Sequence, residues 1–179
     1  LQMFMAERHK PYREAFQTNF FVEGWPLYWE MRLWDMGYPA SPEDRIGMLF
    51  WRMHRCGRII FSMSYHLGRM SGPEAIDFLV ERVGHERDNA AVEVTRSLGG
   101  GYPPLSQISY LVGGLQLRAL ARELVDSGAM TAKAFHDAAL REGSIPVELI
   151  RAKLSGRKLR PDSRTSWKFY EFQAAKKGT

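Results

Sequence analysis

Near the N-terminus an acidic side chain stands among aromatic and apolar residues. Glu23 follows Phe20-Phe21-Val22 and precedes Gly24-Trp25. A carboxylate with such neighbours is either exposed by a turn or held by a partner such as a metal ion or an arginine. Glu30 comes seven residues later, which on a helix places it on the same face, where it could hydrogen-bond to a metal ligand. These two carboxylates are the first candidates for chemistry.

Two further side chains could donate hydrogen bonds or transfer protons. His66 comes at the end of a long predicted helix, where the C-terminal dipole favours an imidazolium. Tyr110 stands in Ser109-Tyr110-Leu111-Val112-Gly113, just after a loop rich in Gly and Pro. Taken alone, His66 is more often a capping or core histidine, and Tyr110 is a core tyrosine. Residue type and spacing therefore leave a helical domain with unexplained polar groups.

Several common catalytic motifs are absent from the sequence. There is no Gly-x-Ser-x-Gly elbow, and the glycines at 99–101 lack the lysine and hydroxyl of a phosphate-binding loop. A self-contained zinc hydrolase would carry His-Glu-x-x-His on one helix. The stretch His85-Glu86-Arg87-Asp88-Asn89 fails at its last position, and we interpret it as a solvated polar segment. The single cysteine, Cys56, excludes an internal disulfide and leaves the compartment undetermined.

The elements that must position these side chains are predicted to be helices throughout. Ser41-Pro42-Glu43-Asp44 starts a helix over 42–69, and Ser71-Gly72-Pro73-Glu74 has the spacing of a capping box. Gly47 and Gly57 inside the first helix are expected to mark the close approach of a neighbouring helix. Further helices are predicted over 72–83, 88–98, 105–127, 131–143 and 146–154. No alternation long enough for a strand is found, so the fold class is all-α.

The length of 179 residues, with 45% hydrophobic and 25% charged residues, suits one globular unit. No apolar run is long enough to span a membrane. Four of five tryptophans and eight of nine methionines precede residue 71. Such a concentration is usually core, but it could also line a ligand box or pack against a part of the protein not present here, or against another copy as an oligomer. The first residue, a leucine, indicates a piece of something longer.

The net charge of +5 comes from the C-terminal tail. Residues 151–179 carry nine Lys or Arg against two acidic residues, whereas the preceding part has a slight acidic excess. A basic tail can bind nucleic acid through counterion release, but it is more often a solvated terminus, so nucleic acid is not the expected partner. Aromatic residues from Trp167 to Phe172 interleave with the charges, which suggests a docked turn at least as strongly as a base-stacking platform.

Several short strings occur in an order that resembles the C-terminal part of a bacterial family, the domain of unknown function 885. The resemblance covers roughly residues 1–155 and leaves 156–179 as a basic tail. The strings are Glu23-Gly24-Trp25-Pro26-Leu27-Tyr28-Trp29-Glu30, Arg55-Cys56-Gly57-Arg58-Ile59, His66, Arg96, Ser109-Tyr110-Leu111-Val112-Gly113, Phe135-His136-Asp137 and Gly143-Ser144-Ile145-Pro146.

That family is similar to helical zinc metallopeptidases whose ligands are two histidines and a later glutamate. By this resemblance the chain is part of a larger helical domain, Leu1 to Arg8 would be the last turns of its metal-binding helix, and Glu23 is the third zinc ligand. Glu30 would support that ligand. His66 and Tyr110 would donate hydrogen bonds to the oxyanion, and Arg96 would hold a substrate carboxylate.

The resemblance implies a fragment of a zinc-dependent peptidase that is inactive alone, because the His-Glu...His segment is missing. Its partners would be the N-terminal part of the same polypeptide and a peptide substrate, with zinc bound only in the intact protein. The alternative is a non-catalytic helical interaction module whose basic tail binds nucleic acid or a protein.

Overall fold

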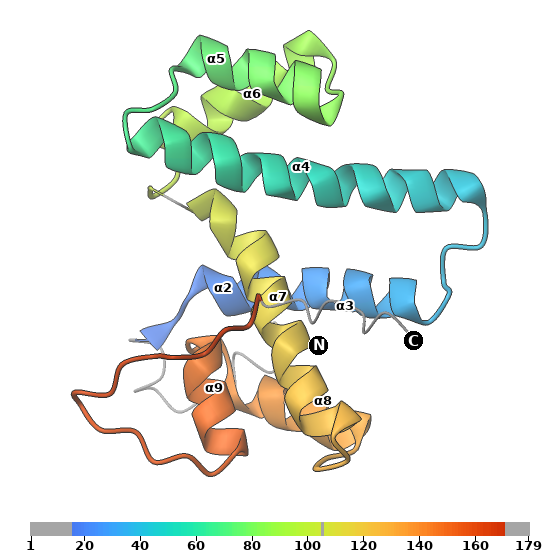
Figure 1. Cartoon of the computed structure of the whole chain (residues 1–179), viewed down its shortest axis with the longest axis vertical. Coiled ribbons are helices and arrows are strands. Elements are labelled where there is room, and N and C mark those ends of the chain that lie inside the picture. The colour runs from blue at the N-terminus through green and yellow to red at the C-terminus, as the bar shows by residue number, and fades with distance from the viewer. Residues whose placement is uncertain (1–15, 105, 171–179) are drawn as a thin grey trace, which may run out of the picture. The chain divides into compact units, whose positions relative to one another are not determined.

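The structure, a computed structural model, describes residues 16–104 and 106–170 (Figure 1). Within these residues every regular element is a helix, which confirms the all-α prediction. The predicted helical turns at Leu1 to Arg8 lie outside the described residues. The elements are α2 (Asn19–Val22), α3 (Gly24–Asp35), α4 (Pro42–His66), α5 (Gly72–Phe78), η2 (Leu79–Val83), α6 (Arg87–Leu98), η3 (Ser106–Ile108), α7 (Ser109–Ala121), η4 (Arg122–Asp126), α8 (Ala132–Glu142) and α9 (Val147–Leu154).

The described chain divides into two compact units. Unit 1 comprises residues up to Tyr28 and from Gly113 onward, and unit 2 comprises Trp29–Val112. Two helices, α3 and α7, run from one unit into the other. None of the described helices is both long and apolar enough to cross a bilayer.

The helix starts are set by local sequence, as predicted. The Ser41 hydroxyl accepts from the backbone N–H of Asp44, and the Asp44 carboxylate accepts from the N–H of Ser41, which completes a capping box at α4. Ser71 and Glu74 form the same reciprocal pair at α5. Each pair satisfies backbone donors that the first helical turn leaves without an intrahelical acceptor.

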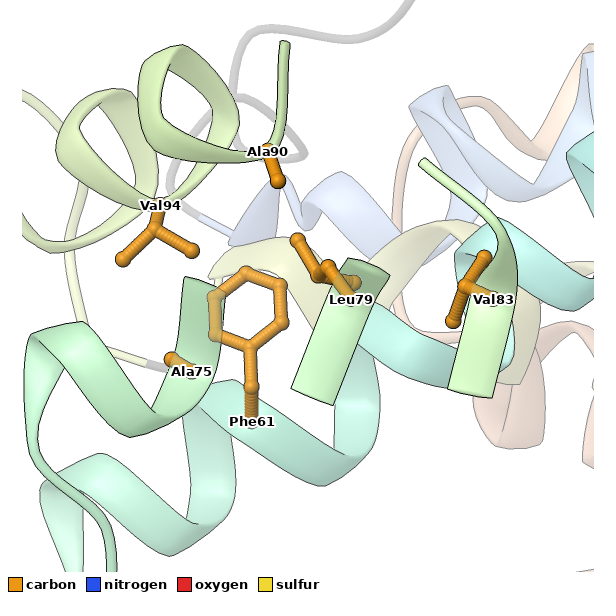
Figure 2. Packing of buried hydrophobic residues seen from close by; sticks show 6 residues of the cluster. All are labelled: Phe61, Ala75, Leu79, Val83, Ala90 and Val94. Atoms are coloured by element: carbon orange, nitrogen blue, oxygen red, sulfur yellow. The ribbon is translucent and has the colours of Figure 1, made fainter. Parts of the chain in front are cut away.

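The core of unit 2 forms where α4 packs against α5, η2 and α6. Figure 2 shows the Phe61 ring of α4 directed into a cluster of small and branched side chains from the other three elements. All of them are at most 3% exposed. The buried cluster consists of Phe61, Ala75, Leu79, Val83, Ala90 and Val94.

Of the two glycines inside α4, only Gly57 marks a close helix approach. A Cβ atom at Gly57 would lie 3.0 Å from Cγ2 of Val83 and 3.2 Å from Cδ2 of Leu79, so the absent side chain lets η2 pack against α4. A Cβ atom at Gly47 would meet nothing within 4 Å. The prediction of a close neighbour at Gly47 was therefore wrong, because that turn of α4 is exposed.

The core of unit 1 combines aromatic side chains before residue 29 with helices α7, α8 and α9. Phe21 stacks on Trp25 with ring centroids 5.6 Å apart, and Tyr28 meets the edge of Phe135 at 6.3 Å. All four rings are at most 7% exposed. Part of the N-terminal aromatic concentration is therefore core, as the first of the interpretations above expected.

Close glycine contacts hold the start of α3 against α7. A Cβ atom at Gly24 would lie 2.4 Å from the backbone carbonyl carbon of Gly113, and one at Gly113 would lie 1.9 Å from the carbonyl oxygen of Phe20. Gly114 makes a looser contact, because a Cβ atom there would lie 3.1 Å from the Leu27 side chain. The two backbones thus approach as closely as only glycine permits. This contact explains the glycines of the Glu-Gly-Trp and Leu-Val-Gly strings.

We predict that Gly113→Ala destabilises the fold by at least about 3 kcal/mol, because the new methyl group must displace backbone. Gly47→Ala is the matched control in another helix interior, and it should stabilise the protein by about 0.5–1 kcal/mol through helix propensity alone. Urea unfolding followed by circular dichroism measures both. Equal stability of the two variants would contradict the close approach of α3 and α7.

Candidate functional site

Glu23 lies in the turn that joins α2 to α3, in unit 1. Its backbone N–H donates to the carbonyl of Asn19 at 2.8 Å and closes α2. The residue is half-buried between buried Phe21 and Trp25. Among the described residues its carboxylate takes part in no hydrogen bond or ion pair. Within the described part of the chain, Glu23 is therefore a half-buried carboxylate without a partner.

Glu30, by contrast, is engaged by an arginine in unit 2. Its two carboxylate oxygens receive the guanidinium of Arg55 at 3.2 and 3.1 Å, and both side chains are about a fifth exposed. The pair forms part of the wall of a groove of about 760 Å³, which Tyr38 and Trp51 also line. The bidentate geometry uses both oxygens of Glu30.

Arg96 and Tyr110 belong to one polar network in unit 2. At its centre is Glu93, which accepts from Nε of Arg58 at 2.6 Å and from Nη2 of Arg96 at 2.8 Å. The Arg58 guanidinium also lies over the Tyr110 ring, 5.2 Å from its centroid. Arg58 is 9% exposed, whereas the Arg96 side chain is 42% exposed. The predicted site residues Arg96 and Tyr110 are therefore connected through Glu93 and Arg58, which were not among the predicted site residues.

Two arginines share one carboxylate in this network. Burial raises the pKa of Glu93, but the hydrogen bonds and charges of Arg58 and Arg96 outweigh it and hold that pKa below its usual range. The hydrogen bond to Glu93 raises the pKa of Arg96. With Glu93 ionised the three groups carry one positive charge in excess, and the exposed Arg96 end can attract an anion.

His66 is the last residue of α4, as expected, and it is exposed. Its ring meets the edge of the neighbouring Tyr65 ring at 5.4 Å. No side-chain hydrogen bond joins it to the network around Glu93 within the described part of unit 2. Its predicted role as an oxyanion donor stays a prediction.

A histidine pair next to this network was not found from the sequence. Nδ1 of His54 on α4 lies 2.7 Å from Nε2 of His85, and His54 is 3% exposed with its Nε2 buried and without a described partner. The polar segment from His85 is solvated over 86–89, as predicted, because these four residues are exposed. Only half-buried His85 departs from the prediction, since it pairs with His54. The Glu86 carboxylate caps α6 by accepting from the N–H groups of Asp88 and Asn89.

Burial and the positive charge of Arg58 lower the pKa of His54 to about 4, and burial also lowers the pKa of His85. Both rings are therefore neutral near pH 7, and one donates a hydrogen bond to the other. No cluster of three or more His, Cys, Asp or Glu side chains that could hold a metal occurs in the described ranges.

Unit 1 holds a second long-range pair that residue spacing did not reveal. The Tyr28 hydroxyl lies 2.8 Å from Nε2 of His136, and the Trp25 ring meets the His136 ring edge-on. Both residues stood in the strings that carried the resemblance, but 108 positions separate them and no local pattern joins them. The pair anchors α8 to α3 beside the turn of Glu23.

The chain resembles known proteins at the level of family and fold. The family described as "Bacterial protein of unknown function (DUF885)" matches residues 1–154. A solved structure described as "The crystal structure of the putative lipoprotein from Colwellia psychrerythraea" has a TM-score of 0.69 at 24% identity. The match covers 77% of this chain and 24% of that chain, and it shows a common fold. No curated protein matches the chain.

The histidine pair predicts a loss of stability on acidification. An unfolded histidine is protonated below about pH 6.5, whereas folded His54 stays neutral until about pH 4. Stability is therefore fully present above pH 6.5 and falls as the pH drops through this window, by about 1–2 kcal/mol between pH 7.5 and 5. Urea midpoints at the two pH values should show this loss. His54→Gln should remove most of it, and His66→Gln, which replaces an exposed histidine, should retain it.

Proposed function

The chain belongs to the bacterial DUF885 family of proteins of unknown function, and we propose that it is the C-terminal helical portion of a zinc-dependent peptidase. In this proposal Glu23 is one zinc ligand, and histidines from a part of the polypeptide outside these 179 residues are the others. The chain spans about a quarter of the solved protein that shares its fold. The activity is therefore proposed for a longer polypeptide, and the chain alone is proposed to be inactive.

The observation that carries the proposal is the state of the Glu23 carboxylate. Three other partly buried carboxylates among the described residues are paired: Glu30 with Arg55, Glu93 with two arginines and Glu123 with Arg151. Glu148 is also half-buried and has no described partner, but it lies on α9 in the wall of a groove with four basic side chains. Glu23 is half-buried but has no described cation or hydrogen-bond donor. Burying a carboxylate is unfavourable unless something compensates its charge, and a divalent cation supplies that compensation.

The described residues fit zinc as a source of one ligand. They hold no complete cluster of ligands, so the remaining ligands must come from residues outside the described ranges. Zinc bound by two histidines and one carboxylate keeps a fourth position for water or a substrate oxygen. The glycine contact between α3 and α7 would fix the carboxylate ligand, because it leaves the turn before Gly24 no room to shift.

The network around Glu93 supports a role for Arg96 in holding a substrate carboxylate. Its excess positive charge lies at the exposed Arg96, whose Nη1 also donates to the Tyr102 hydroxyl at 3.4 Å. Arg58 and Glu93 would orient Arg96 and the Tyr110 ring. The roles of Tyr110 and His66 as hydrogen-bond donors to the oxyanion, and of Glu30 as a support for the metal ligand, rest on the family resemblance.

A groove in unit 1 favours a second candidate, a binding module for polyanions. The groove has a volume of about 500 Å³ and lies between α9 and the following segment. Arg157, Lys158, Arg160 and Arg164 line it, and none of them forms an ion pair with a described residue. Trp167 docks nearby, with the Arg151 guanidinium 4.9 Å from its ring centroid. Basic groups and an aromatic ring together suit single-stranded nucleic acid.

For the peptidase, zinc content is the first measurement. We expect the intact polypeptide to bind one zinc ion, and Glu23→Gln to weaken zinc binding by more than about 100-fold, since loss of a direct ligand should exceed the 10–100-fold effect of an outer-shell partner. Glu86→Gln is the control and should keep the metal, because Glu86 caps α6. Stoichiometric zinc on residues 1–179 alone, or equal loss in both variants, would contradict the assignment of Glu23.

For the second candidate, four phosphate contacts predict about a 50-fold loss of single-stranded DNA affinity between 50 and 200 mM salt. Fluorescence anisotropy with a labelled oligonucleotide measures the dependence of log affinity on log salt concentration. The double variant Arg160→Gln/Arg164→Gln should halve the slope of this dependence. Lys133→Gln, which removes a cation already paired with Asp137 on α8, should leave it unchanged. Binding that does not depend on salt would exclude the basic groove as a nucleic-acid site.

A further inference from the structure

Helix α4 exposes a continuous line of apolar side chains on a face that does not contribute to the core. The buried face of the helix carries His54, Gly57, Arg58, Phe61 and Ser62. The exposed line, which we call the α4 stripe, ranges from 67% exposure at Ile46 to 40% at Met63 and includes the exposed Cys56. The α4 stripe consists of Ile46, Leu49, Met53, Cys56, Ile60, Met63 and Leu67.

The spacing between successive residues of the α4 stripe alternates between three and four along its whole length. This repeat is what two helices need to interdigitate side by side at a crossing angle of about 20°. An apolar face that only met a lipid surface or a small ligand would not require so regular a spacing. The repeat therefore indicates another α-helix as the occupant.

We propose that the α4 stripe is the interface of a homodimer in which the α4 helices of two copies pack antiparallel. A second copy supplies a helix with an identical repeat, so each side chain finds an apolar counterpart. The proposal is independent of zinc and of the peptidase assignment, because it rests on unit 2 alone.

The charges at the two ends of α4 favour the antiparallel arrangement. The start of α4 carries the exposed residues Glu43, Asp44 and Arg45, with one negative charge in excess, whereas His66 ends the helix and Arg69 follows it. In an antiparallel pair the acidic start of one helix lies next to the basic end of the other. The two helix dipoles then point in opposite directions, which is favourable. In a parallel pair like charges would meet at both ends.

The area of the α4 stripe predicts a reversible dimer. Complete coverage of side chains that are 40–67% exposed would bury on the order of 600 Å² per copy, or about 1,200 Å² in the dimer, the lower limit for specific interfaces. We therefore expect a dissociation constant in the micromolar range. Cys56 lies near the middle of the stripe, so the two-fold axis passes close to it and the two thiols face each other between helix axes about 8–10 Å apart.

Sedimentation equilibrium of residues 1–179 between about 1 and 200 μM tests the dimer, and Cys56 labelling by a maleimide should slow over the same range. Leu49→Glu and Ile60→Glu should each weaken association more than 10-fold while circular dichroism shows unchanged helicity. Val92→Glu is the matched control, because Val92 is 66% exposed on α6, outside the stripe. A dimer that both stripe variants leave intact would overturn the proposed interface.

The orientation is tested by cross-linking in a Cys56→Ser background. A short bismaleimide should join Glu43→Cys chains to His66→Cys chains in a mixture, and it should not join either variant to itself. Self-linking of each variant would indicate a parallel pair and overturn the antiparallel arrangement. A chain that is monomeric at 200 μM with a reactive Cys56 overturns the dimer. A thiol protected even at 1 μM shows that another segment covers the stripe, and it overturns the dimer as well.

Discussion

The contact between Gly24 of α3 and Gly113 of α7 is the constraint on which unit 1 depends. At this point the two backbones meet without side chains between them, so neither helix can slide or rotate without a collision. The position of α3 in turn fixes Trp25 and Tyr28, which pack on Phe135 and His136 of α8. Glu23, one residue before Gly24, takes its place from the same contact, so the proposed ligand is only as well positioned as this glycine pair.

Most of the fold could be predicted because its signals are local. Ser41, Ser71 and Thr131 cap their helices through bonds to residues three positions later, and such pairs can be found in a sequence without knowledge of the fold. Two π-helical segments were not predicted, η2 at the end of α5 and η4 at the end of α7. No residue type marks the change from i+4 to i+5 hydrogen bonding. Gly47 and Gly57 could not be distinguished either, because only tertiary packing decides which glycine has a neighbour.

The candidate site was predicted less completely than the fold. The separate residues Glu23, Arg96 and Tyr110 could be named, and the last two share a network, but the residues that connect them could not. Arg58 and Glu93 are 35 positions apart, and His54 and His85 are 31 apart. A polar side chain on a helix can pair with many others, and the choice follows from how α4, α6 and the turn before α6 pack. The incomplete zinc motif at His85 likewise gave no indication that this histidine pairs with His54.

The core shown in Figure 2 also bears on how the chain folds. All of its members lie between residues 61 and 94, on consecutive elements joined by short turns. Because loop closure costs little over such short separations, this subdomain can form early and quickly. Unit 1, whose N-terminal strings must meet α7 and α8 from 87 to 108 positions away, would then be the slower step. During synthesis the helices of unit 2 would pack first. The start of α3 would pack only after α7 and α8 had been made.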